Sequence, residues 1–546
     1  MRARDSNNTP GPSRSPTRTS NEAEDLDRSD RPAIDSKRRS SEADSEKPAF
    51  QTDEDSLDSL ASLGGALEKQ PTPRHLADPN LVTFDVDDPG NPKTWKFGRK
   101  WAAVFVVSTF TLISPISSTM TAPALKYIAA DLNITTEIEQ ELSLSIFVLA
   151  YAIGPLLLGP LSELYGRVIV LQLSNLFYLF FNLGCGLCHT KVQLIVFRFF
   201  AGFGGSAPLA IGGGVLSDLF TAEERGKAMS IYSLAPLLGP AIGPIAGAFI
   251  AENTSWRWIF YATTIADALI QTAGVFLLQE TYTPVLLRWR KERLVRETGN
   301  TALHTDFDDP ERTAARTLAT AFQRPFRLLL TQPIIQVLAL YMMYLYGLMY
   351  LVLSTFPSLW ASYGMSTGVG GLNYIALGLG LFLGSQLCAP LQDRVYARMK
   401  RRYGVSVGRP EFRLPMMAPG ALLVPVGLLI YGWTAQYRTH WIGPDVGVAV
   451  FTAGVIIGFQ CIQTFLVDTY TLYAASAVAA GTVLRSLAGF GFPLFAPSLY
   501  ARLDYGWGNT LLAFIGVLIG WPGPILLWKY GPALRARSPY AAGTRG

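Results

Sequence analysis

The chain contains twelve apolar stretches, each close to the roughly 20 residues that a helix needs to cross the hydrocarbon core of a bilayer. A segment in lipid must satisfy its own backbone hydrogen bonds, and an α-helix does so. The sequence therefore predicts an all-α integral membrane fold with twelve transmembrane helices. They are predicted at 101–121, 141–158, 168–187, 194–216, 229–250, 258–278, 333–355, 371–391, 415–433, 446–466, 478–499 and 509–528.

The overall composition agrees with a protein that lives in lipid. Charged residues make up 16% of the chain, whereas soluble proteins carry roughly 25%. The net charge of +5 is small and spread over the predicted loops, so we expect no binding of nucleic acid. The sequence holds none of the zincin, serine-hydrolase or phosphate-loop motifs. We therefore predict no enzyme activity, no metal and no cofactor.

Positive charge in the loops predicts the orientation in the membrane. With the N-terminus inside, the five predicted cytoplasmic loops hold 19 Lys and Arg residues and the six external loops hold 5. Cytoplasmic loops normally carry the excess of positive charge, so we predict that both termini are cytoplasmic. We also expect a plasma-membrane location, and an internal membrane stays open as the alternative. Sequons at Asn133 and Asn253 fall in predicted external loops and are candidate glycosylation sites.

The chain divides into two six-helix halves with polar segments around them. Gly154 to Glu163 matches Gly384 to Asp393 at an offset of 230 residues, which indicates a parallel repeat. The segment before the first helix is rich in Ser, Pro and charged residues, a composition typical of disorder. The predicted parts are a disordered cytoplasmic tail at 1–90, the N-terminal half at 91–278, a cytoplasmic central loop at 279–328, the C-terminal half at 329–530 and a cytoplasmic tail at 531–546.

The helix predicted at 229–250 carries a face without side chains. Gly239, Gly243 and Gly247 recur at every fourth residue, so they lie on one helix face and allow a partner helix to approach closely. Pro240 and Pro244 each remove a backbone donor and are expected to kink the helix. Such a helix needs protein cover, which predicts that it packs tightly inside the bundle.

A cluster of charged residues follows the helix predicted at 141–158. It consists of Gly159, Glu163, Gly166 and Arg167, and Asp218 at the end of the helix at 194–216 is a candidate partner of Arg167. A carboxylate and a guanidinium beside helix ends can bridge neighbouring helices through charge-assisted hydrogen bonds. The alternative is a loop charge that only orients the chain in the membrane.

Two charged residues lie within predicted spans. Arg198 is placed several residues inside the helix at 194–216, where an arginine costs on the order of 2.5–3.5 kcal/mol unless it faces a wet cavity or reaches the surface. Asp267 is near the middle of the helix at 258–278 and is a candidate proton site, because buried carboxylates exchange protons near neutral pH. A hydrogen-bonded structural aspartate is the alternative for Asp267, and which carboxylate carries a proton stays open.

Aromatic and methionine side chains gather on two helices of the second half. Flexible thioethers and rigid rings form surfaces that accept varied amphipathic ligands. Ordinary packing or lipid contact is the alternative for each residue. The candidate residues of a substrate cavity are Tyr341, Met343, Tyr346 and Tyr350 on the helix at 333–355, and Arg485 and Phe490 on the helix at 478–499.

Together these motifs resemble the major facilitator superfamily, and within it the fungal twelve-helix drug:proton antiporter family. The resemblance covers about residues 80–535 and extends to Asn91 to Trp95, Trp256 to Tyr261, Glu280 to Pro284, Tyr473 to Ala477 and Leu484 to Ser486. It implies that the glycine face is the antiporter motif and that Arg198 takes part in proton coupling. It also implies that the charged cluster holds the outward-facing state and breaks for inward opening.

The resemblance implies a proton-coupled secondary transporter that exports small amphipathic molecules by alternating access. Its partners would be a small-molecule substrate, protons and the lipid bilayer, and we expect a monomer. Proton-coupled uptake of polyamines or another small nutrient stays open, as does a membrane sensor that does not transport. Glu280, Thr281 and Tyr282 stand where sugar porters typically carry Pro-Glu-Ser-Pro-Arg, which argues against sugar uptake.

Overall fold

The computed structural model describes residues 78–85, 88–221, 224–308, 314–405 and 408–541. Of the predicted tails, residues 1–77 and 542–546 lie outside these ranges. Within them the chain is helical, and its one β-type pairing is an isolated bridge between Leu81 and His304.

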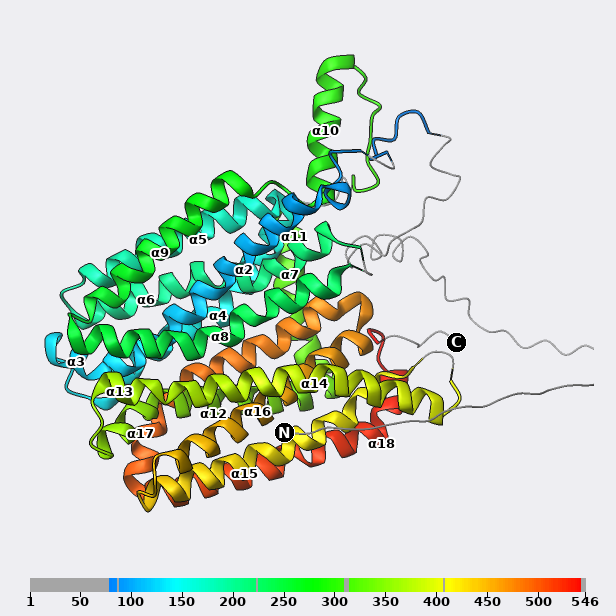
Figure 1. Cartoon of the computed structure of the whole chain (residues 1–546). Helices are drawn as coiled ribbons and strands as arrows, with labels where there is room; N and C mark the ends of the chain where they lie inside the picture. The colour runs from blue at the N-terminus through cyan, green and yellow to red at the C-terminus, as the bar shows by residue number, and fades with distance from the viewer. Residues whose placement is uncertain (1–77, 86–87, 222–223, 309–313, 406–407, 542–546) are drawn as a thin grey trace, which may run out of the picture. The chain divides into compact units, whose positions relative to one another are not determined.

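The described residues of the N-terminal half begin with the short 3₁₀ turn η2 and form eight α-helices (Figure 1). The short η3 and α3 continue the first crossing after α2. Ser206 separates α6 from α7 within another crossing, which spans 191–219. The bounds are η2 Pro92–Thr94, α2 Phe97–Thr119, η3 Ala122–Ala124, α3 Leu125–Asp131, α4 Glu137–Tyr165, α5 Arg167–Leu187, α6 Lys191–Gly205, α7 Ala207–Leu219, α8 Arg225–Asn253 and α9 Arg257–Leu277.

Two helices of the central loop connect this half to the C-terminal one. They are α10 Thr283–Thr298 and α11 Ala314–Thr331. The C-terminal half consists of α12 Pro333–Ser362, α13 Thr367–Leu372, α14 Tyr374–Arg402, η4 Pro410–Met416, α15 Met417–Gln436, α16 Ile442–Thr469, η5 Thr471–Tyr473, α17 Ala474–Gly520 and α18 Pro522–Ala536.

The described residues contain eleven stretches that are long and apolar enough to cross a membrane, and the last of them makes two crossings. It extends over 63 residues, and at Asp504 its backbone leaves the helical region with φ 53° and ψ −179°. The chain reverses there, and contacts bridge the bend: the Tyr500 ring stacks on Tyr505, and the Tyr500 hydroxyl donates to Asn509 Oδ1 over 3.1 Å. Ten stretches that cross once and one that crosses twice give twelve crossings in the described chain, which is the number that the sequence predicts.

The pattern of buried and exposed side chains is the one expected for a bundle of helices in a membrane. In α5 the polar Asn175, Tyr178 and Asn182 are buried, whereas Leu173 and Phe180 are exposed. Lipid chains are as apolar as leucine, so large apolar side chains can face outward while polar ones pair inside. The polar face of α5 therefore points to its neighbours within the N-terminal half, where α5 packs against α4, α6 and α9.

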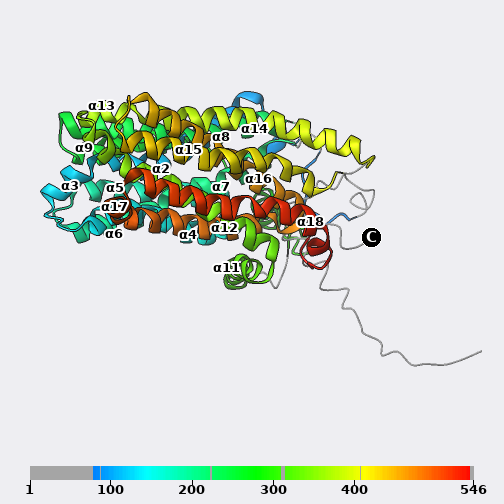
Figure 2. The ribbon, with the colours of Figure 1, turned by 90° about the horizontal axis from the view of Figure 1, so that it is seen from below.

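Both helices of the central loop lie crosswise to the membrane-spanning helices. Figure 1 shows α10 projecting away from one corner of the bundle at a steep angle to the spanning helices, and Figure 2 shows α11 almost end-on beside the spanning helices. The segment before α2 is attached to the loop after α10, where Val82 N donates to His304 O over 2.8 Å. Asp88 forms an ion pair with Arg290. Burial opposes ionisation of this carboxyl, but the hydrogen bonds and charge of Arg290 prevail and lower its pKa.

The two halves meet through direct hydrogen bonds at the end of the bundle that carries α3 and α13. The Tyr127 and Thr367 hydroxyls are 3.1 Å apart, and the Glu252 carboxylate at the end of α8 accepts from Gly368 N over 2.6 Å. Closer to the middle, the Ser118 hydroxyl is 2.9 Å from that of Tyr350. These contacts join the two halves at that end of the bundle.

The sequons predicted from the sequence lie at this same end. Asn133 is exposed in the turn between α3 and α4, where it adopts a left-handed backbone with φ 51°. Asn253 is exposed at the last residue of α8. Glycosylation of either asparagine stays a prediction.

Candidate functional site

The glycine face of α8 receives α2, so the predicted close helix packing is confirmed. A Cβ added at Gly239 would lie 2.5 Å from Pro115 Cβ, and one at Gly243 would lie 2.6 Å from Thr119 Oγ1 and 2.8 Å from the Ile116 carbonyl oxygen. At Gly247 an added Cβ would overlap the carbonyl oxygen of Met120. The chain stays helical through Pro240 and Pro244. Only hydrogen atoms fit on this face.

The opposite side of α8 contacts the C-terminal half. Ala241 lies against Gly378 of α14, where an added Cβ would come within 2.6 Å of the Ala241 Cβ. Ala248 lies against Gly371 of α13, where an added Cβ would overlap the Ala248 Cβ. Small residues on both partners thus let α8 lie between α2 of its own half and two helices of the other. The glycine-rich helix is therefore placed where the two halves meet.

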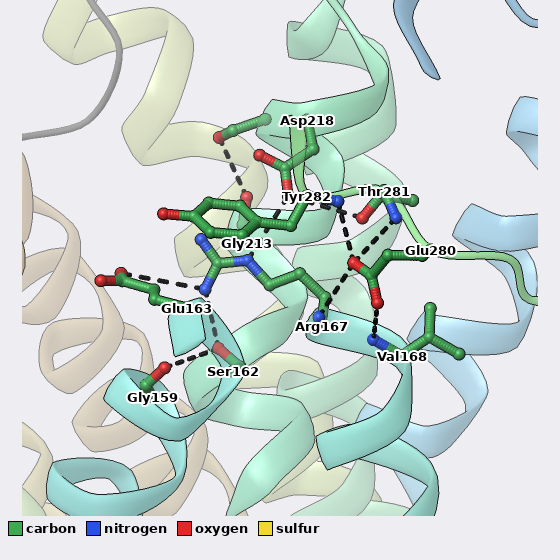
Figure 3. Close-up of polar contacts among 11 residues, drawn as sticks. Gly159, Ser162, Glu163, Arg167, Val168, Gly213, Asp218, Glu280, Thr281 and Tyr282 are labelled. Carbon is green, nitrogen blue, oxygen red and sulfur yellow. Dashed lines mark hydrogen bonds and ion pairs between the residues drawn. The ribbon is translucent and has the colours of Figure 1, made fainter. Parts of the chain in front are cut away.

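The charged cluster predicted after the second crossing forms around Arg167, the first residue of α5 (Figure 3). Its Nε is 3.4 Å from Asp218 Oδ2 at the end of α7, as predicted, and its Nη1 donates to Ser162 Oγ over 2.8 Å. Glu163 is farther, at 3.9 Å. The Gly214 backbone of α7 lies just beneath the guanidinium, where an added Cβ would be 3.1 Å from Arg167 Cζ. The cluster thus joins the ends of α4, α5 and α7 inside the N-terminal half.

Glu280, which follows α9, completes this cluster. Its carboxylate accepts from the backbone N–H groups of Arg167 at 3.0 Å and Val168 at 3.1 Å, and so caps the N-terminus of α5 (Figure 3). Anionic groups are favourable at that end of a helix. Tyr282 adds its ring, with its centre 4.6 Å from Arg167 Cζ. In the sequence, Glu280 and Tyr282 stand out only as part of the family resemblance. Nothing in the sequence shows that α9 ends beside the start of α5.

The two glycines of this cluster have different roles in the structure. Gly166 has φ +112°, a conformation that residues with a side chain rarely adopt, and an added Cβ would overlap the Glu280 carboxylate. Gly159 has no atom within 4 Å of an added Cβ. In this conformation the backbone requires glycine at 166 and not at 159.

The C-terminal half carries a matching charged cluster. Arg413 in η4 pairs with Asp393 Oδ1 of α14 and Asp468 Oδ2 of α16, both at 3.0 Å. Asp393 is the residue that the sequence repeat aligns with Glu163. The cation that pairs with it is Arg413, which is 20 residues along the chain, and not the adjacent Arg394. The repeat therefore extends to the ion pairs at the ends of the helices.

Arg198 on α6 is buried in the N-terminal half and has no exposed surface. Its guanidinium donates to the carbonyl oxygens of Ser117 at 2.8 Å and Ser118 at 3.3 Å on α2, and to Thr121 Oγ1 at 3.1 Å. It also donates to the carbonyl oxygens of Ser143 at 3.2 Å and Leu144 at 3.3 Å on α4. These contacts leave the side chain no room to reach the membrane surface in this conformation.

Asp267 on α9 is also fully buried, and its partner is an amide. Asn175 Nδ2 of α5 lies 3.0–3.1 Å from both carboxylate oxygens and 2.9 Å from Gln271 Oε1. Asp267 and Arg198 do not contact each other. The contacts of Asp267 belong to the packing of α5 against α9 within one half. Its role in proton transfer stays a prediction.

Three residues of the predicted substrate cavity come together between the halves. The ring centres of Tyr346 and Tyr350 are 5.0 Å apart, and Arg485 Cζ of α17 lies 4.9 Å from the centre of the Tyr346 ring. Tyr341 instead packs between Gly458 and Gly520 in the C-terminal core. Met343 and Phe490 are half-buried on α12 and α17.

A row of serines on α2 is a polar feature that sequence reasoning missed. The hydroxyls of Ser114 and Tyr151 of α4 are 2.5 Å apart, and Ser117 hydrogen-bonds Tyr178 of α5. Tertiary packing assembles this network from separate helices, and serine in an apolar helix gives only a weak sequence signal.

Glu141, near the start of α4, is a second missed residue. It is 7% exposed and its Oε2 has no partner. Glu141 is the first residue of the span predicted at 141–158. At the boundary of a span, nothing in the sequence indicates that a carboxylate is buried. Among the described residues, no group of three or more His, Cys, Asp or Glu side chains is placed to hold a metal ion.

Comparison with known proteins identifies the family. Residues 107–493 match the family model described as Major Facilitator Superfamily. The efflux pump vrtL of Penicillium aethiopicum is 52% identical over 85% of this chain and 92% of that protein. The efflux pump radE of Floropilus chiversii is 42% identical over 84% of this chain and 85% of that protein.

A solved structure supports the fold. The proton:xylose symporter XylE, bound to 6-bromo-6-deoxy-D-glucose, matches with a TM-score of 0.59 at 16% identity, over 80% of this chain and 96% of that one. This chain belongs to the major facilitator superfamily. It is a multi-pass membrane protein and a secondary transporter for a small-molecule substrate, and not an enzyme.

Proposed function

We propose that this transporter exports small amphipathic molecules from the cytoplasm in exchange for protons. The observation that carries the proposal is the position of α8, whose glycine face is filled by α2 while its other side contacts α13 and α14. The small residues on both faces of α8 let the two halves pack in tight contact at this junction. Tight contact limits the leakage of protons during exchange. The relatives named efflux pumps, up to 52% identical, support the direction of transport.

The proposal assigns roles to the residues described above. Arg198 and Asp267 take part in proton coupling, and the cluster of Glu163, Arg167 and Asp218 stabilises one of the two end states. The protein acts as a monomer in the plasma membrane with both termini in the cytoplasm. The hydrogen bonds at the α3 and α13 end hold the external side closed in this conformation.

Transport into everted plasma-membrane vesicles tests the direction and the driving force. Vesicles with an acidic lumen should accumulate a labelled substrate from a panel of toxic amphipathic compounds, and a proton ionophore should abolish the accumulation. Vesicles from cells without the protein are the control. Accumulation that does not respond to the ionophore would rule out proton coupling. Gradient-driven accumulation only in right-side-out vesicles would show uptake and contradict export.

A further inference from the structure

Two arginines lie deep in the membrane bundle, one in each half, and their surroundings differ. Arg198 is saturated by five oxygen acceptors of its own protein. Arg485 on α17 is half-buried, and its Nε is buried without a hydrogen-bond partner. No hydrogen bond or ion pair among the described residues involves its guanidinium. One cation is therefore satisfied internally, and the other has no counter-charge.

The groups around Arg485 are aromatic rings. The centre of the Tyr346 ring is 4.9 Å from its Cζ, and the centre of the Phe459 ring of α16 is 6.0 Å away. Tyr346 also contacts Tyr350, whose hydroxyl is hydrogen-bonded to Ser118 of the other half. Aromatic faces stabilise a guanidinium only in part. Arg485 thus lies against the Tyr346 and Phe459 rings, close to the junction of the halves.

A cation in this position needs an anion. Charged side chains inside a membrane protein mark ion and substrate pathways, because their burial is costly unless they are paired. A guanidinium presents parallel N–H donors that match the two oxygens of a carboxylate. The neighbouring rings offer flat surfaces for an aromatic ligand. The missing partner is therefore best supplied by a ligand that carries both groups.

We propose that Arg485, Tyr346 and Phe459 form a subsite that binds the carboxylate of acidic aromatic substrates. The proposal rests on the proposed function insofar as the ligand is the exported molecule, and it narrows the substrate class from amphipathic compounds to organic acids. Arg485 pairs with the carboxylate, and the two rings contact the aromatic part. Neutral analogues keep the ring contacts and lose the ion pair.

Binding of matched acid and amide pairs tests the subsite. The probes are 2-naphthoic acid, 9-anthracenecarboxylic acid and 1-pyrenebutyric acid, each compared with its primary amide at pH 7.5. The full-length protein is reconstituted in nanodiscs, and the signal of empty nanodiscs is subtracted. We expect at least one acid to bind at least about tenfold more tightly than its amide, which is about 1.4 kcal/mol. Equal affinities or no acid binding in all three pairs would overturn the proposal.

Variants separate the ion pair from general packing. Arg485→Gln should lose the preference for the acid and keep the affinity for the amide, whereas Arg485→Lys should keep part of the preference because it retains the charge. Arg502→Gln, at an exposed position of the same helix, is the matched control and should bind like wild type. Thermal unfolding shows whether each variant is folded. A folded Arg485→Gln protein that still prefers the acid would contradict the proposal.

The binding assay needs no proton gradient, so its outcome is independent of the transport test. Acid binding that depends on Arg485, together with no gradient-driven transport, would keep the subsite and remove the proposed export. Gradient-driven export of neutral compounds, with no acid preference in binding, would keep the export and remove the subsite.

Discussion

The hydrogen-bond acceptors of the Arg198 guanidinium are all neutral oxygen atoms, and its Cζ also lies 4.7 Å from the centre of the Phe147 ring. Four of the acceptors are on α2 and α4 and the fifth is Thr121 Oγ1, so one side chain ties three helices together in the N-terminal half. Backbone carbonyls inside these helices already accept one hydrogen bond each, and their second lone pair is free for the arginine. A change in the charge or position of Arg198 is therefore transmitted to α2, which also packs against α8.

Arg198→Ala should abolish gradient-driven transport and also destabilise the protein. Arg198→Ala removes five hydrogen bonds from a charged donor. Each such hydrogen bond contributes about 1.5–3 kcal/mol, so we expect a loss of at least about 3 kcal/mol. Arg198→Lys keeps the charge with fewer donors and should unfold at a temperature between those of alanine and wild type. Proton-driven transport per amount of folded protein is the functional measurement. Full transport by both variants would show that Arg198 has no part in coupling.

Gly166→Ala should destabilise the charged cluster around Arg167, and Gly159→Ala should not. At 166 a side chain meets both an unfavourable φ of +112° and the Glu280 carboxylate, so the cap on α5 must move. At 159 an added methyl group meets open space. The measurement is thermal unfolding of the two purified variants next to wild type. Equal unfolding temperatures for the two would contradict the structural difference between these glycines.

Helix α8 lies between the two halves and is closely packed on both sides, against α2 on one and against α13 and α14 on the other. Its glycines face backbone atoms of Ile116 and Met120 as well as the Pro115 and Thr119 side chains, and backbone atoms cannot move aside as a flexible side chain would. Its alanines face glycines of α13 and α14, so both surfaces depend on the absence of side chains. Interiors are packed at nearly crystal density, and one added group on either surface must displace a helix.

Gly243→Val should separate α8 from α2 and uncouple transport from proton flow. Overpacking of this kind costs about 1–3 kcal/mol. Even Gly243→Ala should have a measurable effect, because its Cβ would lie 2.8 Å from the Ile116 carbonyl oxygen. Proton flux without substrate is measured in reconstituted vesicles and normalised to protein. Gly226→Ala, at an exposed site on the same helix with no neighbour within 4 Å, is the control. If Gly243→Val showed normal efflux and no more proton flux without substrate than wild type, this role of α8 would be refuted.

Considered as a whole, the molecule has two ends of different character. The α3 and α13 end joins the halves by hydrogen bonds between Tyr127 and Thr367 and between Glu252 and Gly368. The other end carries the crosswise α10 and α11 and the two charged clusters, whose ion pairs each stay within one half. The halves are thus joined by hydrogen bonds at one end, while at the other end each ion pair joins helices of the same half.

Cysteine labelling should establish the orientation of these ends. The four native cysteines are buried, so their background reaction with an impermeant thiol reagent should be low. Thr135→Cys, exposed between α3 and α4, should react in intact cells. Arg402→Cys, exposed at the end of α14, should react only after permeabilisation. Labelling of position 402 from outside would reverse the proposed topology.

Locking the α3 and α13 end should stop transport. Cysteines introduced together at Tyr127 and Thr367, whose hydroxyls are 3.1 Å apart, should be joined by a short bifunctional thiol reagent. If this end must open to release substrate outside, the cross-linked protein should bind substrate and not export it. Each single cysteine variant treated with the same reagent is the control. Export at the wild-type rate with complete cross-linking would show that the end does not open.

Local rules were enough to predict several parts of this protein. Helix number, the small-residue face at Gly239, Gly243 and Gly247, and the pairing of Arg167 with Asp218 could all be inferred from sequence. Each depends on a constraint that acts on neighbouring residues or on every membrane protein. Lipid forces backbone hydrogen bonds into helices, a spacing of four residues defines one helix face, and charge at helix ends favours opposite charge nearby.

Other assignments depended on which helices become neighbours, and that is decided by packing over the whole chain. Glu280 caps α5 across more than a hundred residues of sequence, and Asp393 pairs with Arg413, which is 20 residues away, and not with the adjacent Arg394. Tyr341 and Tyr346, five residues apart on one helix, separate into the core and the junction of the halves. Arg198 and Arg485 are both arginines in apolar helices, and only their surroundings distinguish a cation satisfied by carbonyl oxygens from one that lacks a partner.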